Sequence, residues 1–317
     1  MNQPIQLIPE YRDYVWGGDK LRPGYSPTAE VWAVYENDRV AAGPQAGRSL
    51  AELAAEDGEK FLGKYVQQQT GGRFPLLIKL LDCAQWLSVQ VHPNDEQAVR
   101  LEGAGFFGKT EAWHVLGAEP EAQLIAGMKP GVSAEALSAG IADGTILTLS
   151  QYLDVSAGET IFIRPGTIHA LGPGLLIYEV QQSSDLTYRV YDWGRPQTEK
   201  RKLHIEKSLA VTDPRASTQV VPNPVLADGE CRVLVHNSYF KLEIMAAETL
   251  PITLDTGGQT FHALTLIEGQ AQVTVASGPG SWKLGRFETI LIPAACGAYR
   301  IEPIGAFRAL KSSVEPV

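Results

Sequence analysis

Most hydrophobic residues of this chain fall in short runs bounded by glycine or proline, a pattern typical of β-strands. After about residue 220 almost every such run is strand-like, and no segment there shows a convincing helical period. The strands predicted before that point cover residues 74–81, 87–91, 111–116, 122–126, 160–163, 175–181 and 187–191. Many short strands indicate a mainly β protein of the sandwich or jelly-roll type.

A few helices are expected among these strands, all in the N-terminal part. Ser49 and Glu52 form a capping box, and Ser133 has the same position relative to a second amphipathic stretch. The predicted helices cover residues 49–65, 95–101, 133–143 and 204–211.

The chain is expected to form two domains. Residues 221–224 read Val-Pro-Asn-Pro, which is typical of a linker, so we expect domains at residues 1–218 and 219–317. A weak internal repeat agrees with two β-barrels. Residues 115–125 resemble residues 265–274, and residues 159–165 resemble residues 288–293, so both matched pairs occur in the same order along the chain.

Composition narrows the class of function. The net charge of −9 argues against general binding to nucleic acid or to anionic membranes, but it leaves a small anionic substrate open. The three cysteines, Cys83, Cys231 and Cys296, lack the spacing of a disulfide or CxxC framework, which favours a reducing compartment. No signal peptide and no apolar run of about 18 residues is evident, so we expect a cytoplasmic protein.

Three segments together predict a metal site. Gln90 and His92 are two residues apart, so on a strand both side chains point to the same face. Glu111 adds a carboxylate on another predicted strand, and His169 follows a Pro-Gly turn. Two imidazoles, one carboxylate and one amide suit a divalent ion such as zinc, with room left for a ligand.

The segments that carry these residues resemble the type I mannose-6-phosphate isomerases in their short bacterial form. The resemblance rests on residues 88–93 (Ser-Val-Gln-Val-His-Pro), 109–111 (Lys-Thr-Glu), 165–169 (Pro-Gly-Thr-Ile-His) and 179–189, in the same order along the chain. It spans about residues 5–215 and implies the cupin fold, here as two cupin-like jelly-roll barrels with a few helices inserted in the N-terminal part.

This resemblance also implies an activity and a set of site residues. The family interconverts mannose 6-phosphate and fructose 6-phosphate through an enediolate with the help of zinc, one ion per chain. The matched zinc ligands are Gln90, His92, Glu111 and His169. The matched catalytic positions are Arg189, Glu179 and Lys109, and the matched substrate-binding positions are Lys79, Ser88 and Asp185.

The identity of the general base stays open between two residues. Glu179 is the first choice because a carboxylate in a closed pocket can reach a pKa suited to proton transfer, and Lys109 is the second. Arg189 would stabilise negative charge on the enediolate. Lys79 lies in an apolar run, where a lysine needs an anionic partner.

Some segments depart from the longer members of the family. Gly108 precedes Lys109 where the longer enzymes carry histidine, and Leu171 stands where they carry tyrosine. The longer forms also turn sooner after the position of Arg189. Substrate contacts from these segments are therefore not assigned.

The second copy of the internal repeat is expected to lack a metal. Gly297 takes the position of His169, and Phe261 takes that of Glu111. His262 lies one residue away from the matched position. One ion in the N-terminal domain is therefore the prediction.

Two other functions remain open at this stage. One is a metal cupin of another activity, such as an iron dioxygenase, which would favour a site richer in histidine. The other is a non-catalytic, sugar-phosphate-binding regulatory cupin. The expected partner in every case is a small molecule, with no nucleic acid and no membrane, and the expected assembly is a monomer or a weak homo-oligomer.

Overall fold

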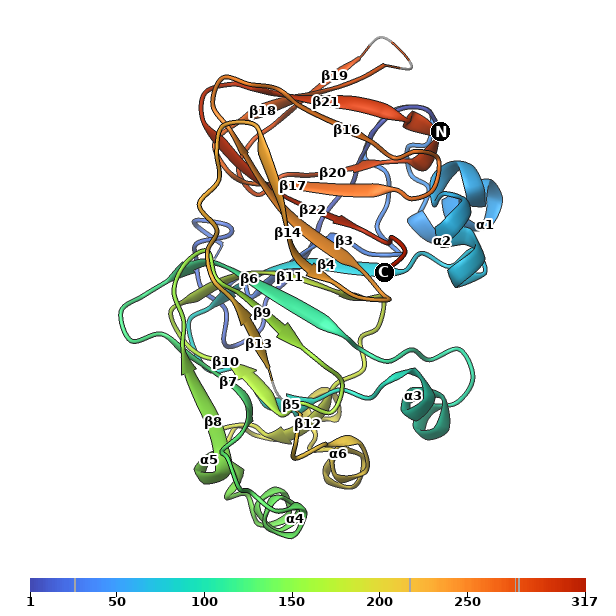
Figure 1. Ribbon diagram of the computed structural model, residues 1–317. Helices are drawn as coiled ribbons and strands as arrows, with labels where there is room; N and C mark the ends of the chain where they lie inside the picture. Colours follow the sequence, from blue (N-terminus) through green and yellow to red (C-terminus); the bar gives the residue numbers. More distant parts are fainter. Residues whose placement is uncertain (26, 217, 277, 279) are drawn as a thin grey trace. The chain divides into compact units, whose positions relative to one another are not determined.

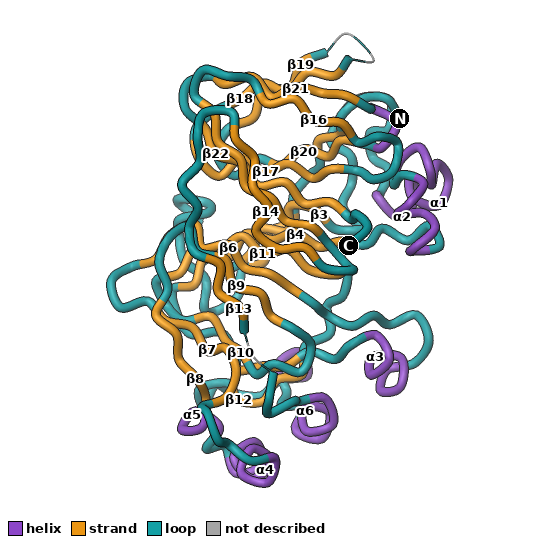
Figure 2. Tube along the Cα trace, in the orientation of Figure 1, coloured by secondary structure: helices purple, strands orange, loops and turns teal. Residues whose placement is uncertain are grey.

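A computed structural model describes residues 1–25, 27–216, 218–276, 278 and 280–317. Most of its regular elements are β-strands, which confirms the predicted mainly β class (Figures 1 and 2). The chain forms two compact units. The first unit contains Met1–Glu10, Trp32–Lys79 and Pro224–Val317, and the second unit contains Tyr11–Val31 and Leu80–Asn223. Closure of each unit into a jelly-roll barrel stays a prediction.

The second unit is built on two sheets. The five-stranded sheet has the order β12 (Tyr188–Tyr191), β5 (Val89–Val91), β10 (His169–Leu171), β7 (Gln123–Met128) and β8 (Ser150–Asp154). The seven-stranded sheet has the order β13 (Gln219–Val221), β9 (Thr160–Ile163), β6 (Glu111–Ala118), β11 (Leu175–Gln182), β4 (Leu76–Cys83), β3 (Glu30–Val34) and β2 (Glu10–Arg12). The division between the two units falls within β4, β3 and β2.

An apolar core fills the space between these two sheets. Leu124 and Leu171 contribute to it from the five-stranded sheet, and Trp113, Ile161 and Ile177 contribute from the seven-stranded sheet. Because side chains alternate along a strand, the residues two positions from these share the same inward face. His169 precedes Leu171 by two residues, and Glu111 precedes Trp113 by two, so both point into the interior.

Helices cover the outer face of the five-stranded sheet (Figure 1). The helices of this unit are α3 (Asp95–Glu102), α4 (Ala134–Asp143), α5 (Ile146–Leu149), α6 (Ile205–Val211) and the short 3₁₀ helix η1 (Glu199–Arg201). Leu137 of α4 and Val211 of α6 pack in one cluster with Val91 of β5. The helices predicted at 95–101, 133–143 and 204–211 are confirmed to within one or two residues.

The first unit also contains two sheets. One has the order β1 (Ile5–Gln6), β20 (Thr289–Ile292), β17 (His262–Glu268), β22 (Phe307–Ser313), β15 (Lys241–Ala247) and β14 (Glu230–His236). The other has the order β16 (Ile252–Asp255), β21 (Ala298–Pro303), β18 (Ala271–Val275) and β19 (Ser281–Leu284), and the 3₁₀ helix η2 covers Ala294–Cys296.

The N-terminal helical segment of the first unit differs from the single helix predicted at residues 49–65. The capping box at Ser49 and Glu52 is confirmed, but α1 (Leu50–Phe61) ends and α2 (Lys64–Thr70) begins on either side of a break. Gly63 lies at this break with a φ of 96°, and a Cβ there would come within 2.2 Å of the backbone carbonyl carbon of Gln259. Only glycine tolerates that backbone conformation and that close approach.

No single position in the sequence separates the two compact units, because each contains segments from different parts of the chain. The separation at Asn223 and Pro224 falls close to the expected boundary near residue 218, yet the first unit also takes in residues 1–10 and 32–79. Strand pairing explains part of this difference, because Ile5 pairs with Leu291. The division into domains at residues 1–218 and 219–317 therefore stays a prediction.

No helix in the described part of the chain is long and apolar enough to cross a membrane.

Candidate metal centre and active site

Three strand ends place the predicted metal ligands together inside the second unit. His92 directly follows β5, His169 is the first residue of β10, and Glu111 is the first residue of β6. Each of the three side chains is at most 1% exposed. Two strands come from one sheet and the third from the facing sheet, so the ligands converge only because the two sheets pack face to face.

The three side chains are close enough to share one ion. The Nε2 atoms of His92 and His169 are 3.1 Å apart. The Glu111 Oε1 atom lies 3.2 Å from the His169 Nε2 and 3.8 Å from the His92 Nε2. Among the described residues, these three form the group of histidine, cysteine and acidic side chains whose possible ligand atoms all lie within 4.8 Å of one another.

A hydrogen bond at the Nδ1 atom of each imidazole leaves its Nε2 atom able to bind a cation. The Nδ1 of His92 lies 2.8 Å from the carbonyl oxygen of Leu186, and the Nδ1 of His169 lies 2.8 Å from that of Thr167. A carbonyl only accepts, so each Nδ1 carries the proton and each Nε2 keeps a lone pair. Burial lowers the pKa of His169 to about 3, which keeps that ring neutral near pH 7.

This donor set fits a divalent metal ion. Two lone pairs directed at each other across 3.1 Å repel unless a cation or a proton lies between them, and a buried carboxylate beside them adds negative charge. Two imidazole nitrogens and one carboxylate are typical ligands of zinc. Sequence spacing predicted these three residues correctly as neighbours, while their binding of zinc stays a prediction.

Lys109 lies directly beside this triad. Its Nζ is 2.5 Å from the Glu111 Oε2, 3.2 Å from the His92 Nε2 and 3.7 Å from the Glu179 Oε1. The side chain is only 4% exposed. The ammonium group therefore joins two carboxylates and a predicted metal ligand in one buried network.

The backbone around Lys109 is held by side chains from other elements. The Oδ1 atom of Asp95 accepts hydrogen bonds from the Gly108 N–H at 2.8 Å and from the Gln182 Nε2 at 3.0 Å. Gln182 in turn accepts the Thr110 N–H at 2.9 Å. Both residues that flank Lys109 are thus fixed, which limits the positions that its side chain can reach.

Glu179 enters the network from β11 together with a residue that the sequence did not point out. Trp113 lies opposite Glu179 in the antiparallel pair of β6 and β11, and its Nε1 donates a hydrogen bond of 3.0 Å to the Glu179 Oε2. The Trp113 ring also contacts the His169 ring edge-on, with 5.4 Å between centroids. Its spacing of two residues from Glu111 was the signal that could have identified it.

Gln90 and Arg189 extend this arrangement across the five-stranded sheet. In the strand register Gln90 lies opposite His169 on one side and opposite Arg189 on the other. Directly opposite residues share a face of the sheet, so all three side chains belong to the inward face. Direct binding of a metal by Gln90 stays a prediction.

The Arg189 guanidinium is half-buried without an ion pair to any residue that the structure describes. Its Nη1 donates to the carbonyl oxygen of Lys202 at 3.1 Å, while its Nε is buried without a hydrogen-bond acceptor. Burial, followed by the nearby charge of Arg201, lowers the pKa of Arg189. A cation in this state favours an anionic ligand.

The three predicted substrate-binding residues have different surroundings. Ser88 is buried two residues before Gln90, directly before β5. Asp185 is exposed in the loop between β11 and β12, and its side chain makes no hydrogen bond or ion pair with the described residues. Lys79 is buried in the first unit, with its Nζ 5.0 Å from the centroid of the Trp32 ring. Their roles stay predictions.

Two of the four histidines outside the cluster are also buried. His114 is buried, and its Nδ1 lies 2.9 Å from the Thr160 hydroxyl. His262 of the first unit is also buried, with its Nδ1 2.8 Å from the Tyr299 hydroxyl. Neither belongs to the converging group in the described part of the chain.

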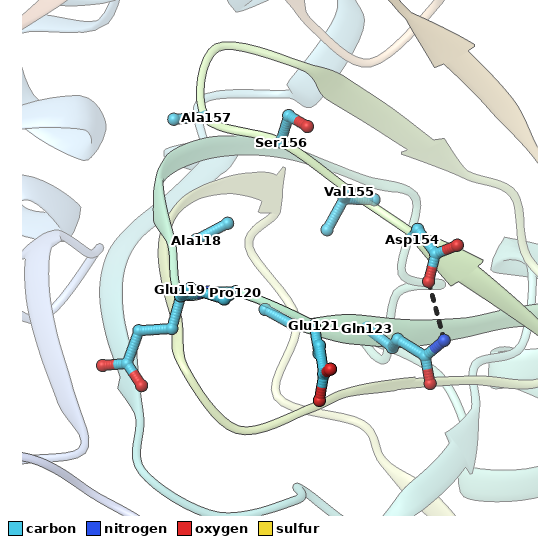
Figure 3. A pocket seen from close by; sticks show the side chains of 10 residues that line it. Ala118, Glu119, Pro120, Glu121, Gln123, Asp154, Val155, Ser156 and Ala157 are labelled. Carbon is cyan, nitrogen blue, oxygen red and sulfur yellow. Dashed lines mark hydrogen bonds between the residues drawn. The ribbon is translucent and has the colours of Figure 1, made fainter.

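A surface pocket of about 820 Å³ lies at the opposite end of β6 from Glu111 (Figure 3). Its walls come from the loop after Ala118 and from residues 154–157, and a hydrogen bond of 2.7 Å joins Gln123 to Asp154 across it. Ala118 follows Glu111 by seven positions along β6, a span of about 23 Å. This pocket contains none of the residues of the cluster, so its size does not make it the site of the chemistry.

Known proteins similar to this chain share one function in their names. Residues 5–106 match the catalytic domain of type I phosphomannose isomerases. A mannose-6-phosphate isomerase of Streptococcus mutans serotype c is 34% identical over 318 residues, which cover 95% of this chain and 96% of that protein. A probable mannose-6-phosphate isomerase of Bacillus subtilis is also 34% identical and covers 95% and 97%. The crystal structure of the mannose 6-phosphate isomerase from Bacillus subtilis matches with a TM-score of 0.86 at 30% identity, covering 98% of this chain and 99% of that chain.

Proposed function

This chain belongs to the type I phosphomannose isomerase family, and from that premise we propose that it interconverts mannose 6-phosphate and fructose 6-phosphate. The observation that carries the proposal is the buried group of His92, Glu111 and His169 with Lys109 and Glu179 beside it. That group combines metal ligands, a carboxylate and a cation, which are the parts that an aldose–ketose isomerisation requires.

His92, Glu111 and His169 would hold the metal ion, with Gln90 as a further ligand. We propose zinc, one ion per chain, because two imidazoles and a carboxylate match its preferences. When bound, such an ion acts as a Lewis acid toward the oxygens of the open-chain sugar.

Glu179 is our proposed general base, with Lys109 as the alternative. The reaction moves a proton from C2 to C1 of mannose 6-phosphate while the carbonyl shifts from C1 to C2, so one group can remove the proton and return it to the neighbouring carbon. Glu179 has one oxygen 3.7 Å from the Lys109 ammonium and the other bound by Trp113. Lys109 would then stabilise the carboxylate form that accepts the proton.

Arg189 would stabilise the negative charge of the enediolate that forms between the two proton transfers. It shares the inward face of the five-stranded sheet with His169, and it forms no ion pair with the described residues. A guanidinium in that position is available to an anionic group of the substrate.

Cationic side chains would also bind the phosphate group, a dianion that needs positive charge in a partly buried site. Lys79, Lys109 and Arg189 are the proposed contacts, with Ser88 and Asp185 as further substrate-binding residues. The cytoplasmic location and the monomeric or weakly oligomeric state stay predictions.

The test is an assay of the purified, zinc-supplemented protein with mannose 6-phosphate, in which formation of fructose 6-phosphate is followed. Formation of the ketose at a rate that scales with enzyme concentration supports the proposal. Tight binding of mannose 6-phosphate without turnover would instead indicate a regulatory sugar-phosphate-binding protein, and oxygen consumption with a different substrate would indicate another metal cupin.

A further inference from the structure

We infer that Trp113 is a positioning residue that orients Glu179 for proton transfer, an inference that rests on the proposed function. The Trp113 indole N–H donates to the Glu179 Oε2 at 3.0 Å, while the Glu179 Oε1 faces the Lys109 Nζ at 3.7 Å. One carboxylate oxygen is thus held by the indole, and the other is turned toward the residues of the metal centre.

The strand register gives this contact its rigidity. Glu179 of β11 and Trp113 of β6 are a directly opposite pair, so their Cβ atoms lie about 5 Å apart on the same face. The indole is 1% exposed and belongs to the apolar core, which prevents it from changing its rotamer freely. A donor on a packed ring therefore fixes the carboxylate more firmly than a donor on a flexible side chain would.

Burial makes the hydrogen bond important for the charge state of Glu179 as well as for its direction. Glu179 is 4% exposed and shares one face of β11 with Ile177, an apolar residue that cannot solvate a carboxylate. A hydrogen bond from an N–H group stabilises the ionised form, which is the form that a general base needs.

The same indole also contacts a metal ligand. The Trp113 ring contacts the His169 ring edge-on, with 5.4 Å between centroids. The His169 ring is also held by the hydrogen bond from its Nδ1 to the Thr167 carbonyl oxygen. A packing role alone would require only bulk in this position. The N–H donor directed at Glu179 is the feature that a packing role does not explain.

A double-mutant cycle on the zinc-loaded enzyme separates these roles. Trp113→Phe should lower kcat by about 10- to 100-fold, the effect expected when a hydrogen bond to a charged group is lost, with KM for mannose 6-phosphate changed less than threefold or so. The same substitution in an enzyme that already carries Glu179→Gln should lower kcat by less than about threefold, because Trp113 would act through the carboxylate. Equal effects in both backgrounds would overturn the inference.

A second substitution removes the donor without changing the shape of the ring. Replacement of Trp113 by benzothienylalanine, which has sulfur in place of the indole N–H, should reproduce the loss of kcat in a protein of near-normal thermal stability. Retention of full kcat by this variant would show that only the bulk of the ring matters. Trp16→Phe, which removes an indole from the same apolar core, serves as the control and should affect stability more than kcat.

A measurement that does not depend on activity keeps the inference separate from the proposed function. A crystal structure of the zinc-loaded Trp113→Phe variant should show the Glu179 carboxylate rotated away from its position in the wild type, with His92, Glu111 and His169 unmoved. An unmoved Glu179 would contradict the positioning role whatever the reaction is. Absence of isomerase activity in the wild type would instead contradict the proposed function alone.

Discussion

The Nε2 atoms of His92 and His169 face each other at 3.1 Å, and the Nδ1 of each ring is bound to a backbone carbonyl oxygen. This relationship joins the end of β5 to the start of β10, which are neighbours in one sheet although the two residues are far apart in the sequence. It leaves both lone pairs directed at one point, with the Glu111 carboxylate beside them. The metal prediction follows from this geometry.

We predict one divalent ion per chain, lost together with activity when a ligand is removed. His92→Ala or His169→Ala should lower the metal content to near zero, because each deletes one of the two buried nitrogens. His262→Ala is the matched control and should leave both metal and activity unchanged, since its Nδ1 is occupied by Tyr299 in the other unit. Elemental analysis that finds two tightly bound ions, or an unchanged content in His169→Ala, would refute this prediction.

Arg189→Ala should lower turnover by at least about 10²-fold with little loss of metal, because an arginine that acts on the enediolate stabilises the transition state and not the ion. Steady-state kinetics and elemental analysis of the same preparation measure both effects. Near-normal kcat in a folded, zinc-loaded variant would mean that Arg189 does not contact the reacting carbons.

The phosphate group should be required for efficient turnover. Free mannose lacks the dianion that Lys79, Lys109 and Arg189 are proposed to bind, so its kcat/KM should be at least ~10³-fold lower, equivalent to roughly 4 kcal/mol. Higher ionic strength should raise KM for mannose 6-phosphate by screening the charge of Arg189, which is only half-buried. Equal efficiency on both sugars with no effect of salt would favour a free-sugar isomerase.

Gly108→Ala should impair catalysis by displacing Lys109. A Cβ at Gly108 would lie 2.5 Å from the Asn94 carbonyl carbon, so the backbone would have to move. Gly117→Ala on the adjoining strand β6 is the control, because its Cβ would meet only the Leu176 Cβ at 3.7 Å. We expect a lower kcat for the first variant and near-normal kcat for the second, and equal values would indicate that the backbone adjusts without moving Lys109.

Acid should destabilise the protein partly through His262. Burial lowers the pKa of His262 to about 3 in the folded state, whereas an unfolded histidine titrates near 6.5. The unfolded state therefore binds more protons between these values, and the free energy of unfolding should fall as the pH drops from about 6.5 toward 3, by up to about 1.4 kcal/mol per pH unit. His262→Gln should show a flatter dependence in denaturant unfolding of the zinc-loaded proteins, and identical slopes would rule out this contribution.

Local sequence patterns predicted the class of fold and brought out the three residues of the candidate metal site. Short runs bounded by glycine and proline predicted the strands, and the capping residues Ser49 and Ser133 predicted where helices begin. The spacing of Gln90 and His92 predicted a shared face, since alternation along a strand depends only on local backbone geometry.

Only the tertiary structure decided which distant residues meet. Trp113 and Glu179 are neighbours because β6 pairs with β11 in one particular register, and a shift of one strand by a single residue would place its side chain on the face opposite to its partner's. The placement of residues 1–10 and 32–79 with the C-terminal strands likewise depends on strand pairs such as Ile5 with Leu291. Pairing and register are set by the burial of the whole inward face, which is a property of the packed sheets and not of any one segment.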